Sequence, residues 1–138
     1  MSYRPSWDKV WMEFARSISH RSYDPRHQVG AVIVTEDNTQ VLAVGYNGNF
    51  AGGPNKVEST IPGESGMIHA EINALLKMDF NNPKGKKMYV TLSPCRMCAK
   101  AIVNAGIDEV VYGEEYRDPA GIDLLKSVNI KARFFPIN

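Results

Sequence analysis

The chain has 138 residues, the usual size of one domain, and we expect a single domain over residues 1–138. Sixteen Lys and Arg residues against fifteen Asp and Glu residues leave a formal charge of +1, so long nucleic acid is not expected as a partner. Two cysteines are too few for a disulfide framework, and we find neither a signal peptide nor an apolar run of membrane-spanning length. We therefore expect a cytoplasmic protein with no membrane partner.

The first part of the chain predicts a helix followed by a β-hairpin. Ser6 can cap an amphipathic helix in which apolar residues recur at spacings of three and four as far as Ile18. Two apolar segments joined by a polar turn predict antiparallel strands, at residues 29–35 and 41–46. A loop rich in Gly, Asn and Pro follows over residues 47–66, and loops of this length often cover a site.

The rest of the chain alternates helices with single strands. Helices are predicted from Ile68 to the break at Asn81, from Pro94 to Gly106 and from Asp118 to about Ser127, with strands at 88–92, 110–112 and 130–135. This order predicts an α/β fold in which helices cover both faces of a five-stranded mixed sheet. Because a helix joins the last two strands, its crossover makes the fourth and fifth strands parallel.

Both cysteines lie in a Cys-x-x-Cys motif at the predicted start of a helix. The sulfur atoms of Cys95 and Cys98 share one helix face and can grip a single ion, and the unpaired amides of the helix N-terminus favour thiolates. The motif alone leaves open a redox pair, half of a structural zinc site or a catalytic zinc site. A structural zinc needs four protein ligands, and the distant His20 and His27 are interpreted as surface residues.

The tripeptide His69-Ala70-Glu71 supplies a third ligand and an acid–base group at the start of another helix. Three protein ligands leave one coordination position open for water, which is the catalytic arrangement of zinc. Residues two apart on a helix point in different directions, so His69 and Glu71 can share a site only beyond the helix end. The joint pattern predicts zinc held by His69, Cys95 and Cys98, with Glu71 as the catalytic residue that moves protons.

These two motifs together resemble the signature of zinc-dependent deaminases. From Val29 through the last predicted strand, the chain resembles the cytidine and deoxycytidylate deaminase family. The segments DPRHQVGA from Asp24 and GYNG from Gly45 resemble its deoxycytidylate branch, as do HAEINAL and CAKAIVNAGIDEVVY. The resemblance implies a three-layer α/β/α cytidine-deaminase-like fold, and an enzyme that hydrolyses dCMP to dUMP and ammonia and so supplies dUMP for thymidylate synthesis.

The resemblance also implies contacts to the substrate. In the family, the asparagine of GYNG, here Asn47, contacts the sugar, and backbone groups near Ala70 and Ser93 contact the amine and the ring. Arg117 is a candidate for binding the phosphate because a guanidinium can form two hydrogen bonds with it, and Tyr116 is a candidate for closing over the base. The alternatives are a strand-end turn for Asn47, a solvated charge for Arg117 and packing at the rim for Tyr116.

Many deoxycytidylate deaminases are hexamers that dCTP activates and dTTP inhibits, with Mg²⁺ at the regulatory nucleotide. The resemblance therefore implies a homo-oligomer with these effectors. Arg26 is a candidate for the substrate phosphate, or for a regulatory site together with Gly48 and Asn49. The segment 49–67 lacks the additional Cys and His residues that hold a second, structural zinc in many members, so we expect one Zn²⁺ per chain.

Three other functions stay open. A tRNA adenosine deaminase resembles the segment around Cys95 almost as well, but the GYNG stretch and the near-neutral charge favour a nucleotide substrate. A deaminase that prefers dCTP differs in pocket dimensions that the sequence does not give. A noncatalytic zinc-binding module has no need of a carboxylate at Glu71, which argues against that function.

Overall fold

The computed structural model describes residues 3–55 and 66–137, so the loop predicted over 47–66 lies partly outside the described residues. Four helices and five strands follow one another in the described residues, in the predicted order. In chain order they are α1 (Trp7–Ser19), β1 (Gly30–Thr35), β2 (Val41–Tyr46), α2 (Ala70–Lys77), β3 (Lys86–Val90), α3 (Arg96–Asn104), β4 (Glu109–Tyr112), α4 (Ala120–Ser127) and β5 (Lys131–Phe134).

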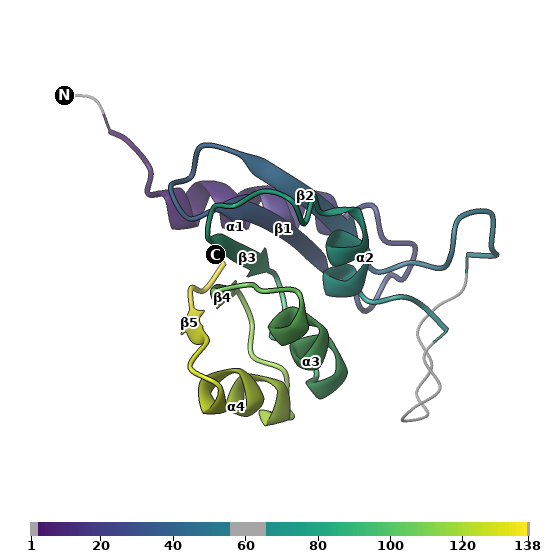
Figure 1. Ribbon diagram of the computed structural model, residues 1–138. Helices are drawn as coiled ribbons and strands as arrows, with labels where there is room; N and C mark the ends of the chain where they lie inside the picture. The colour runs from purple at the N-terminus through teal and green to yellow at the C-terminus, as the bar shows by residue number, and fades with distance from the viewer. Residues whose placement is uncertain (1–2, 56–65, 138) are drawn as a thin grey trace.

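The strands form one mixed sheet in the order β2-β1-β3-β4-β5 (Figure 1). β1 is antiparallel to both of its neighbours, β2 and β3. β4 is parallel to both β3 and β5, with Val110 opposite Met88 and Ala132. The predicted hairpin and the predicted parallel pairing of the last two strands are both confirmed.

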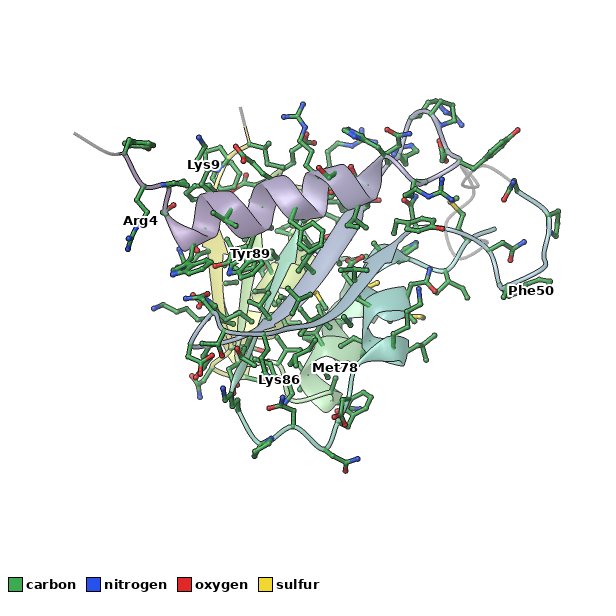
Figure 2. The ribbon with its side chains drawn as sticks, turned by 90° about the horizontal axis from the view of Figure 1, so that it is seen from above. Arg4, Lys9, Phe50, Met78, Lys86 and Tyr89 are labelled. Carbon is green, nitrogen blue, oxygen red and sulfur yellow. The ribbon has the colours of Figure 1, made fainter. Side chains whose placement is uncertain are left out.

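Helices cover both faces of the sheet and make three layers, as predicted. α1 lies on one face, and α2, α3 and α4 lie on the other (Figures 1 and 2). The strand β1, between β2 and β3, is buried on both faces. Its alternating side chains divide between the layers, because Val32 and Val34 pack with α1, whereas Ala31 and Ile33 pack on the opposite side. No helix among the described residues is long and apolar enough to cross a membrane.

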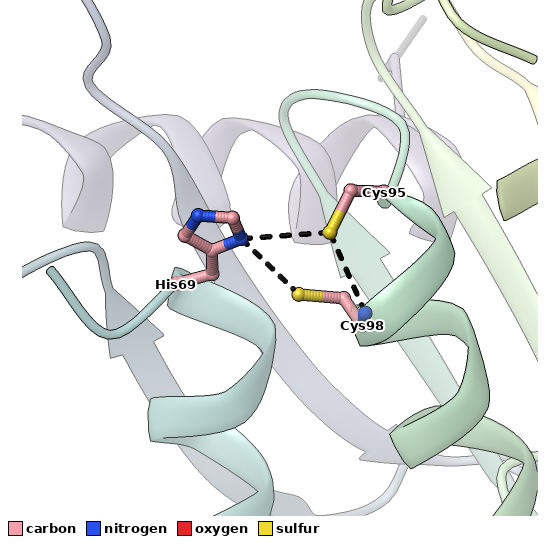
Figure 3. Close-up of side chains that lie close together, drawn as sticks. All are labelled: His69, Cys95 and Cys98. Carbon is pink, nitrogen blue, oxygen red and sulfur yellow. Dashed lines mark hydrogen bonds between the residues drawn. The ribbon is translucent and has the colours of Figure 1, made fainter. Parts of the chain in front are cut away.

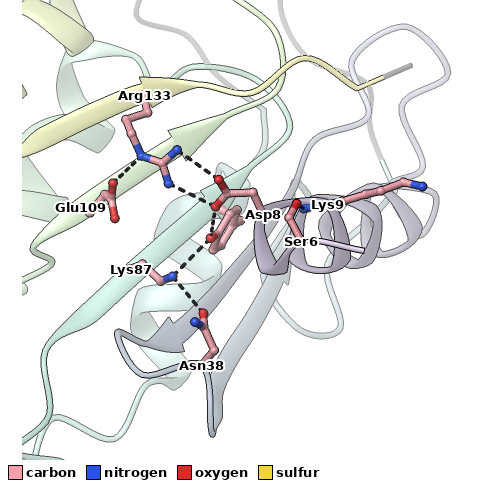
Figure 4. A network of polar contacts seen from close by, with 8 residues as sticks. Ser6, Asp8, Lys9, Asn38, Lys87, Glu109 and Arg133 are labelled. Carbon is pink, nitrogen blue, oxygen red and sulfur yellow. Dashed lines mark hydrogen bonds and ion pairs between the residues drawn. The ribbon is translucent and has the colours of Figure 1, made fainter. Parts of the chain in front are cut away.

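A polar network fastens the first turn of α1 to the sheet (Figure 4). The Tyr89 ring is fully buried, and its hydroxyl donates to the Asp8 carboxylate at 2.5 Å. Two guanidinium nitrogens of Arg133 donate to the same carboxylate at 3.1 Å, and a third donates to Glu109 at 2.6 Å. Since Glu109 is the first residue of β4, this network holds together the end of the sheet from which the parallel strands start.

The ends of several elements differ from the predictions by a few residues. Ile68 lies outside α2 and instead bridges Gly48 through backbone hydrogen bonds of 2.8 and 3.0 Å. Pro94 precedes the N-cap of α3 instead of lying in its first turn. β3 starts at Lys86 because that residue pairs with Thr35 of β1, so the strand covers 86–90 instead of 88–92. Pairing across the sheet, which local sequence does not reveal, sets these ends.

Two glycines allow helices to lie unusually close to the backbone beneath them. A Cβ at Gly45 would lie 2.5 Å from both the Ala70 carbonyl oxygen and the Ala74 nitrogen of α2. A Cβ at Gly121 of α4 would lie 2.0 Å from the Pro94 carbonyl oxygen, immediately before α3. These close approaches fix the positions of both helix starts that carry the predicted metal ligands.

We expect Gly45→Ala to lower the free energy of unfolding by about 1–3 kcal/mol, because α2 must move away from β2. Urea denaturation of the purified chain measures the change. Gly48→Ala is the matched control, since a Cβ there meets only the Tyr46 ring at 3.7 Å, and its stability should stay within about 0.5 kcal/mol of wild type. Equal stability of Gly45→Ala and wild type would show that α2 is not held by this contact.

Candidate metal centre and its cavity

The predicted ligands lie at the starts of two neighbouring helices. His69 is the N-cap of α2 and Cys95 is the N-cap of α3, both with extended backbone, and Cys98 lies in the first turn of α3. A cap residue is not yet helical, so its side chain can project past the helix end. This geometry allows His69 and Glu71 to face one site although they are only two residues apart.

The three ligand atoms converge on one point (Figure 3). His69 Nδ1 lies 3.6 Å from Cys95 Sγ and 3.4 Å from Cys98 Sγ, and all three atoms are within 4.8 Å of one another. Ligands on a tetrahedral zinc are separated by roughly 3.5–3.8 Å, given Zn–S bonds of about 2.3 Å and Zn–N bonds of about 2.0 Å. The soft sulfur and imidazole donors and their spacing therefore fit zinc. They form the only such group of three among the described residues.

The two thiols have strongly different acidities. A hydrogen bond with Cys98 lowers the pKa of Cys95 to about 4, and His69 and the Cys98 amide act in the same direction. Its hydrogen bond with Cys95, together with burial, raises the pKa of Cys98. One thiolate and one thiol thus share a proton, which a metal cation would displace on binding.

Glu71 lies in the first turn of α2 with only 4% of its surface exposed. Burial raises the pKa of its carboxyl to about 7, and its own backbone N–H and His69 oppose that rise only partly. A carboxyl with this pKa can both accept and release a proton near neutral pH. The arrangement therefore offers acid–base chemistry beside a metal centre.

A cavity of about 370 Å³, called here the metal cavity, is lined by the ligands His69 and Cys95 but not by the buried Cys98. Most of the residues that the sequence predicted for the site line this cavity. Three further lining residues, His27, Val29 and Leu92, were not predicted. The full lining is His27, Val29, Asn47, His69, Ala70, Glu71, Leu92, Ser93, Cys95, Tyr116 and Arg117. Polar and apolar side chains are mixed in this lining.

A second hollow of about 520 Å³, called here the side groove, shares residues with the metal cavity, including His27, Tyr116 and Arg117. Arg26 and His20 line only this groove, so Arg26 does not face the metal directly. Gly48 and Asn49 line neither hollow. Of the three predicted regulatory residues, only Arg26 therefore lines either of these two hollows among the described residues.

Asn47 is buried, and its side chain holds the segment that leads into β1. Its Oδ1 accepts a hydrogen bond from the Val29 amide at 2.9 Å, and its Nδ2 donates to the His27 carbonyl. Asn73, which the sequence did not single out, plays a similar part from α2: its Nδ2 donates to the carbonyls of Tyr46 at 2.9 Å and Ile68 at 3.3 Å. The sequence offered one signal for Asn73, because it is a polar residue on the inner side of a short predicted helix.

Comparisons with known proteins agree with this geometry. The sequence pattern described as the cytidine and deoxycytidylate deaminase zinc-binding region matches residues 5–114. Human deoxycytidylate deaminase is 37% identical over 124 residues, which are 81% of this chain and 67% of the human protein. The deoxycytidylate deaminase of Mycobacterium phage D29 is 36% identical over 127 residues, which are 81% of this chain and 98% of the phage protein.

A solved structure shows the same fold. The dCMP deaminase of cyanophage S-TIM5, crystallised in complex with dCMP and dUMP, superposes with a TM-score of 0.82. Its sequence is 32% identical, and the match covers 97% of this chain and 100% of the phage chain. With the sequence pattern, the relatives and the fold in agreement, this chain belongs to the cytidine and deoxycytidylate deaminase family.

Proposed function

We propose that this chain, as one domain over residues 1–138, hydrolyses dCMP to dUMP and ammonia and thereby supplies dUMP for thymidylate synthesis. The observation that carries the proposal is the buried Glu71 in one cavity lining with His69 and Cys95, whose ligand atoms converge with that of Cys98. The named activity of the relatives and the nucleotides bound to the cyanophage enzyme support dCMP as the substrate.

In this proposal, His69, Cys95 and Cys98 hold one Zn²⁺ per chain. These residues would hold the metal, which when bound would supply a water of lowered pKa, roughly 7, and so a nucleophile near neutral pH. Glu71 would take one proton from that water and deliver it to N3 of the cytosine ring as the oxygen bonds to C4. It would then take the remaining proton from the new C4 hydroxyl and deliver it to the amine, so that ammonia leaves as the C4 carbonyl forms. The position of Glu71 supports this role, since it lies in the first turn of α2, two residues from His69, and lines the metal cavity.

The backbone beside the metal positions the base. We assign contacts with the ring and its amine to backbone groups at Ala70 and Ser93, both of which line the metal cavity. Tyr116 would close over the base from the loop after β4. Asn47 would contact the sugar while its side chain holds the backbone at His27 and Val29, and its burial supports this fixed position.

The phosphate would lie where the metal cavity meets the side groove. Arg117 lines both hollows, and Arg26 lines the groove, so a phosphate at their junction could receive hydrogen bonds from either guanidinium. We assign the phosphate first to Arg117, because it alone of the two also lines the metal cavity. Arg26 then contacts a phosphate that extends into the groove.

The family resemblance supports four further proposals. These are assembly as a homo-oligomer, a hexamer in many relatives; activation by dCTP; inhibition by dTTP; and Mg²⁺ bound with the regulatory nucleotide. A regulatory site at Arg26, Gly48 and Asn49 would need contacts beyond the two hollows described above, because only Arg26 lines either of them. We also propose that the enzyme works in the cytoplasm.

The metal content of the purified chain tests the zinc site. We expect one Zn²⁺ per chain by elemental analysis. Loss of a residue that only supports a metal ligand weakens metal binding by roughly 10–100-fold. Because Cys98 is proposed as a ligand itself, Cys98→Ser should weaken zinc binding by at least that factor. Chelation should abolish turnover, and added zinc should restore it. Two tightly bound zinc ions per chain would contradict the proposed ligand set.

Glu71→Gln tests the proton carrier. We expect this variant to keep its zinc but to lose turnover of dCMP by roughly 10²–10⁴-fold, because an amide cannot carry the proton. Steady-state ammonia release and zinc content are measured on the same samples. Glu36→Gln, at an exposed position in the β1–β2 turn, is the matched control and should keep wild-type turnover. Near-normal activity of Glu71→Gln would overturn the assignment.

A substrate panel tests the activity itself. Ammonia release is measured with dCMP, dCTP, deoxycytidine and tRNA, each with and without added dCTP or dTTP. We expect dCMP to be turned over with the highest kcat/KM and tRNA not to react. A preference for dCTP would place the triphosphate in the side groove, whereas inosine formation in tRNA would identify the chain as an adenosine deaminase.

A further inference from the structure

The loop after β4 carries two of the residues that line the metal cavity. Residues 114–117, called here the rim loop, are all exposed to solvent and include Tyr116 and Arg117. Both of these side chains belong to the proposed substrate contacts, yet neither lies on a helix or strand. What holds this loop in place therefore bears directly on substrate binding.

Ser93 forms hydrogen bonds with the rim loop at two points. Its backbone N–H donates to the Glu114 carbonyl at 2.9 Å, and its hydroxyl accepts a hydrogen bond from the Tyr116 N–H at 2.7 Å. In a regular parallel pairing, a residue whose N–H donates to the partner segment also accepts, through its own carbonyl, the N–H two residues further along that segment. For Ser93, which donates to Glu114, that N–H belongs to Tyr116. Here the Ser93 hydroxyl takes that amide in place of the carbonyl.

The position of Ser93 makes it a firm support. It is 6% exposed and lies two residues before the metal ligand Cys95. Its segment continues from β3, whose neighbour β4 leads into the rim loop, and Gly113 N–H donates to the Val90 carbonyl at 3.0 Å just beyond the paired strands. The hydroxyl therefore links the rim loop to the same rigid segment that carries the metal centre.

We propose that Ser93 is a positioning residue whose hydroxyl holds Tyr116 and Arg117 at the rim of the metal cavity through the Tyr116 amide. This inference rests on the proposed function, since the molecule that the rim grips is the nucleotide substrate. The inference concerns the hydroxyl of Ser93, whereas the family resemblance assigns a role only to the backbone of Ser93. Its consequence is that Ser93 controls substrate binding, with little effect on the chemical step or on the metal.

Ser93→Ala in the zinc-loaded full chain tests the proposal. We expect the KM for dCMP to rise about tenfold, as for the loss of one buried hydrogen bond that positions a binding group, while kcat changes by less than about threefold. Hydrogen exchange of the Tyr116 amide, followed by NMR, should become at least about tenfold faster. Zinc content should stay at the wild-type value.

Ser127→Ala is the matched control. The Ser127 hydroxyl donates a similarly short hydrogen bond, 2.6 Å to the Leu124 carbonyl, at the exposed end of α4. Its removal should leave KM within about twofold of wild type. In a Tyr116→Ala/Arg117→Ala background, Ser93→Ala should cause no further rise in KM, because the groups that it positions are gone.

Three results would overturn the proposal. A raised KM with unchanged exchange of the Tyr116 amide would mean that the hydroxyl contacts the substrate itself, and faster exchange with unchanged KM would mean that the rim does not grip the substrate. Loss of zinc in Ser93→Ala would indicate a purely structural role. If the wild-type chain does not deaminate dCMP, the proposed function is refuted separately. Hydrogen exchange of the Tyr116 amide still tests whether the Ser93 hydroxyl holds the rim loop. KM is then measured with whichever substrate of the panel reacts.

Discussion

Two helices must begin side by side for this site to exist. His69 and Cys95 are the N-caps of α2 and α3. Their ligand atoms lie 3.6 Å apart because both helices start at the same end of the sheet, where β2 and β3 finish beside the start of β1. That juxtaposition depends on close packing, since α2 rests on the backbone at Gly45 and α4 rests on the backbone just before α3. The positions of Cys98 and Glu71, each in the first turn of one of these helices, follow from it.

The electrostatics of the site favour a cation at this meeting point. Two thiols and a carboxyl are gathered in one place, where burial raises the pKa of Glu71 to about 7 and the hydrogen bond between Cys95 and Cys98 separates the pKa values of the two thiols. Partial positive charge at two helix N-termini offsets only part of this crowding of acidic groups. A divalent ion would neutralise both thiolates and favour the charged form of Glu71, so the ligand set is complete only with its metal.

The sequence was sufficient to predict features that repeat along the chain or that form short local motifs. Apolar periodicity predicted all four helices and five strands, and two short motifs taken together, His-x-Glu and Cys-x-x-Cys, predicted the grouping of His69, Cys95 and Cys98, which the structure confirms. Features that depend on distant segments were missed. His27 is exposed, as interpreted, but it also lines the cavity, which was not predicted, and Ile68 pairs with Gly48 instead of starting α2. Neither contact leaves a local pattern in the sequence.

The metal centre and the rest of the cavity are built in different ways. The metal ligands lie on helix starts fixed by backbone packing, whereas the other walls are irregular segments held by single polar side chains, Asn47 for residues 27–29 and Ser93 for residues 114–117. A side-chain hydrogen bond can be replaced without disturbing the sheet, but a helix start cannot be moved without losing the metal. Substrate preference can therefore change through these segments while the metal centre and Glu71 stay in place.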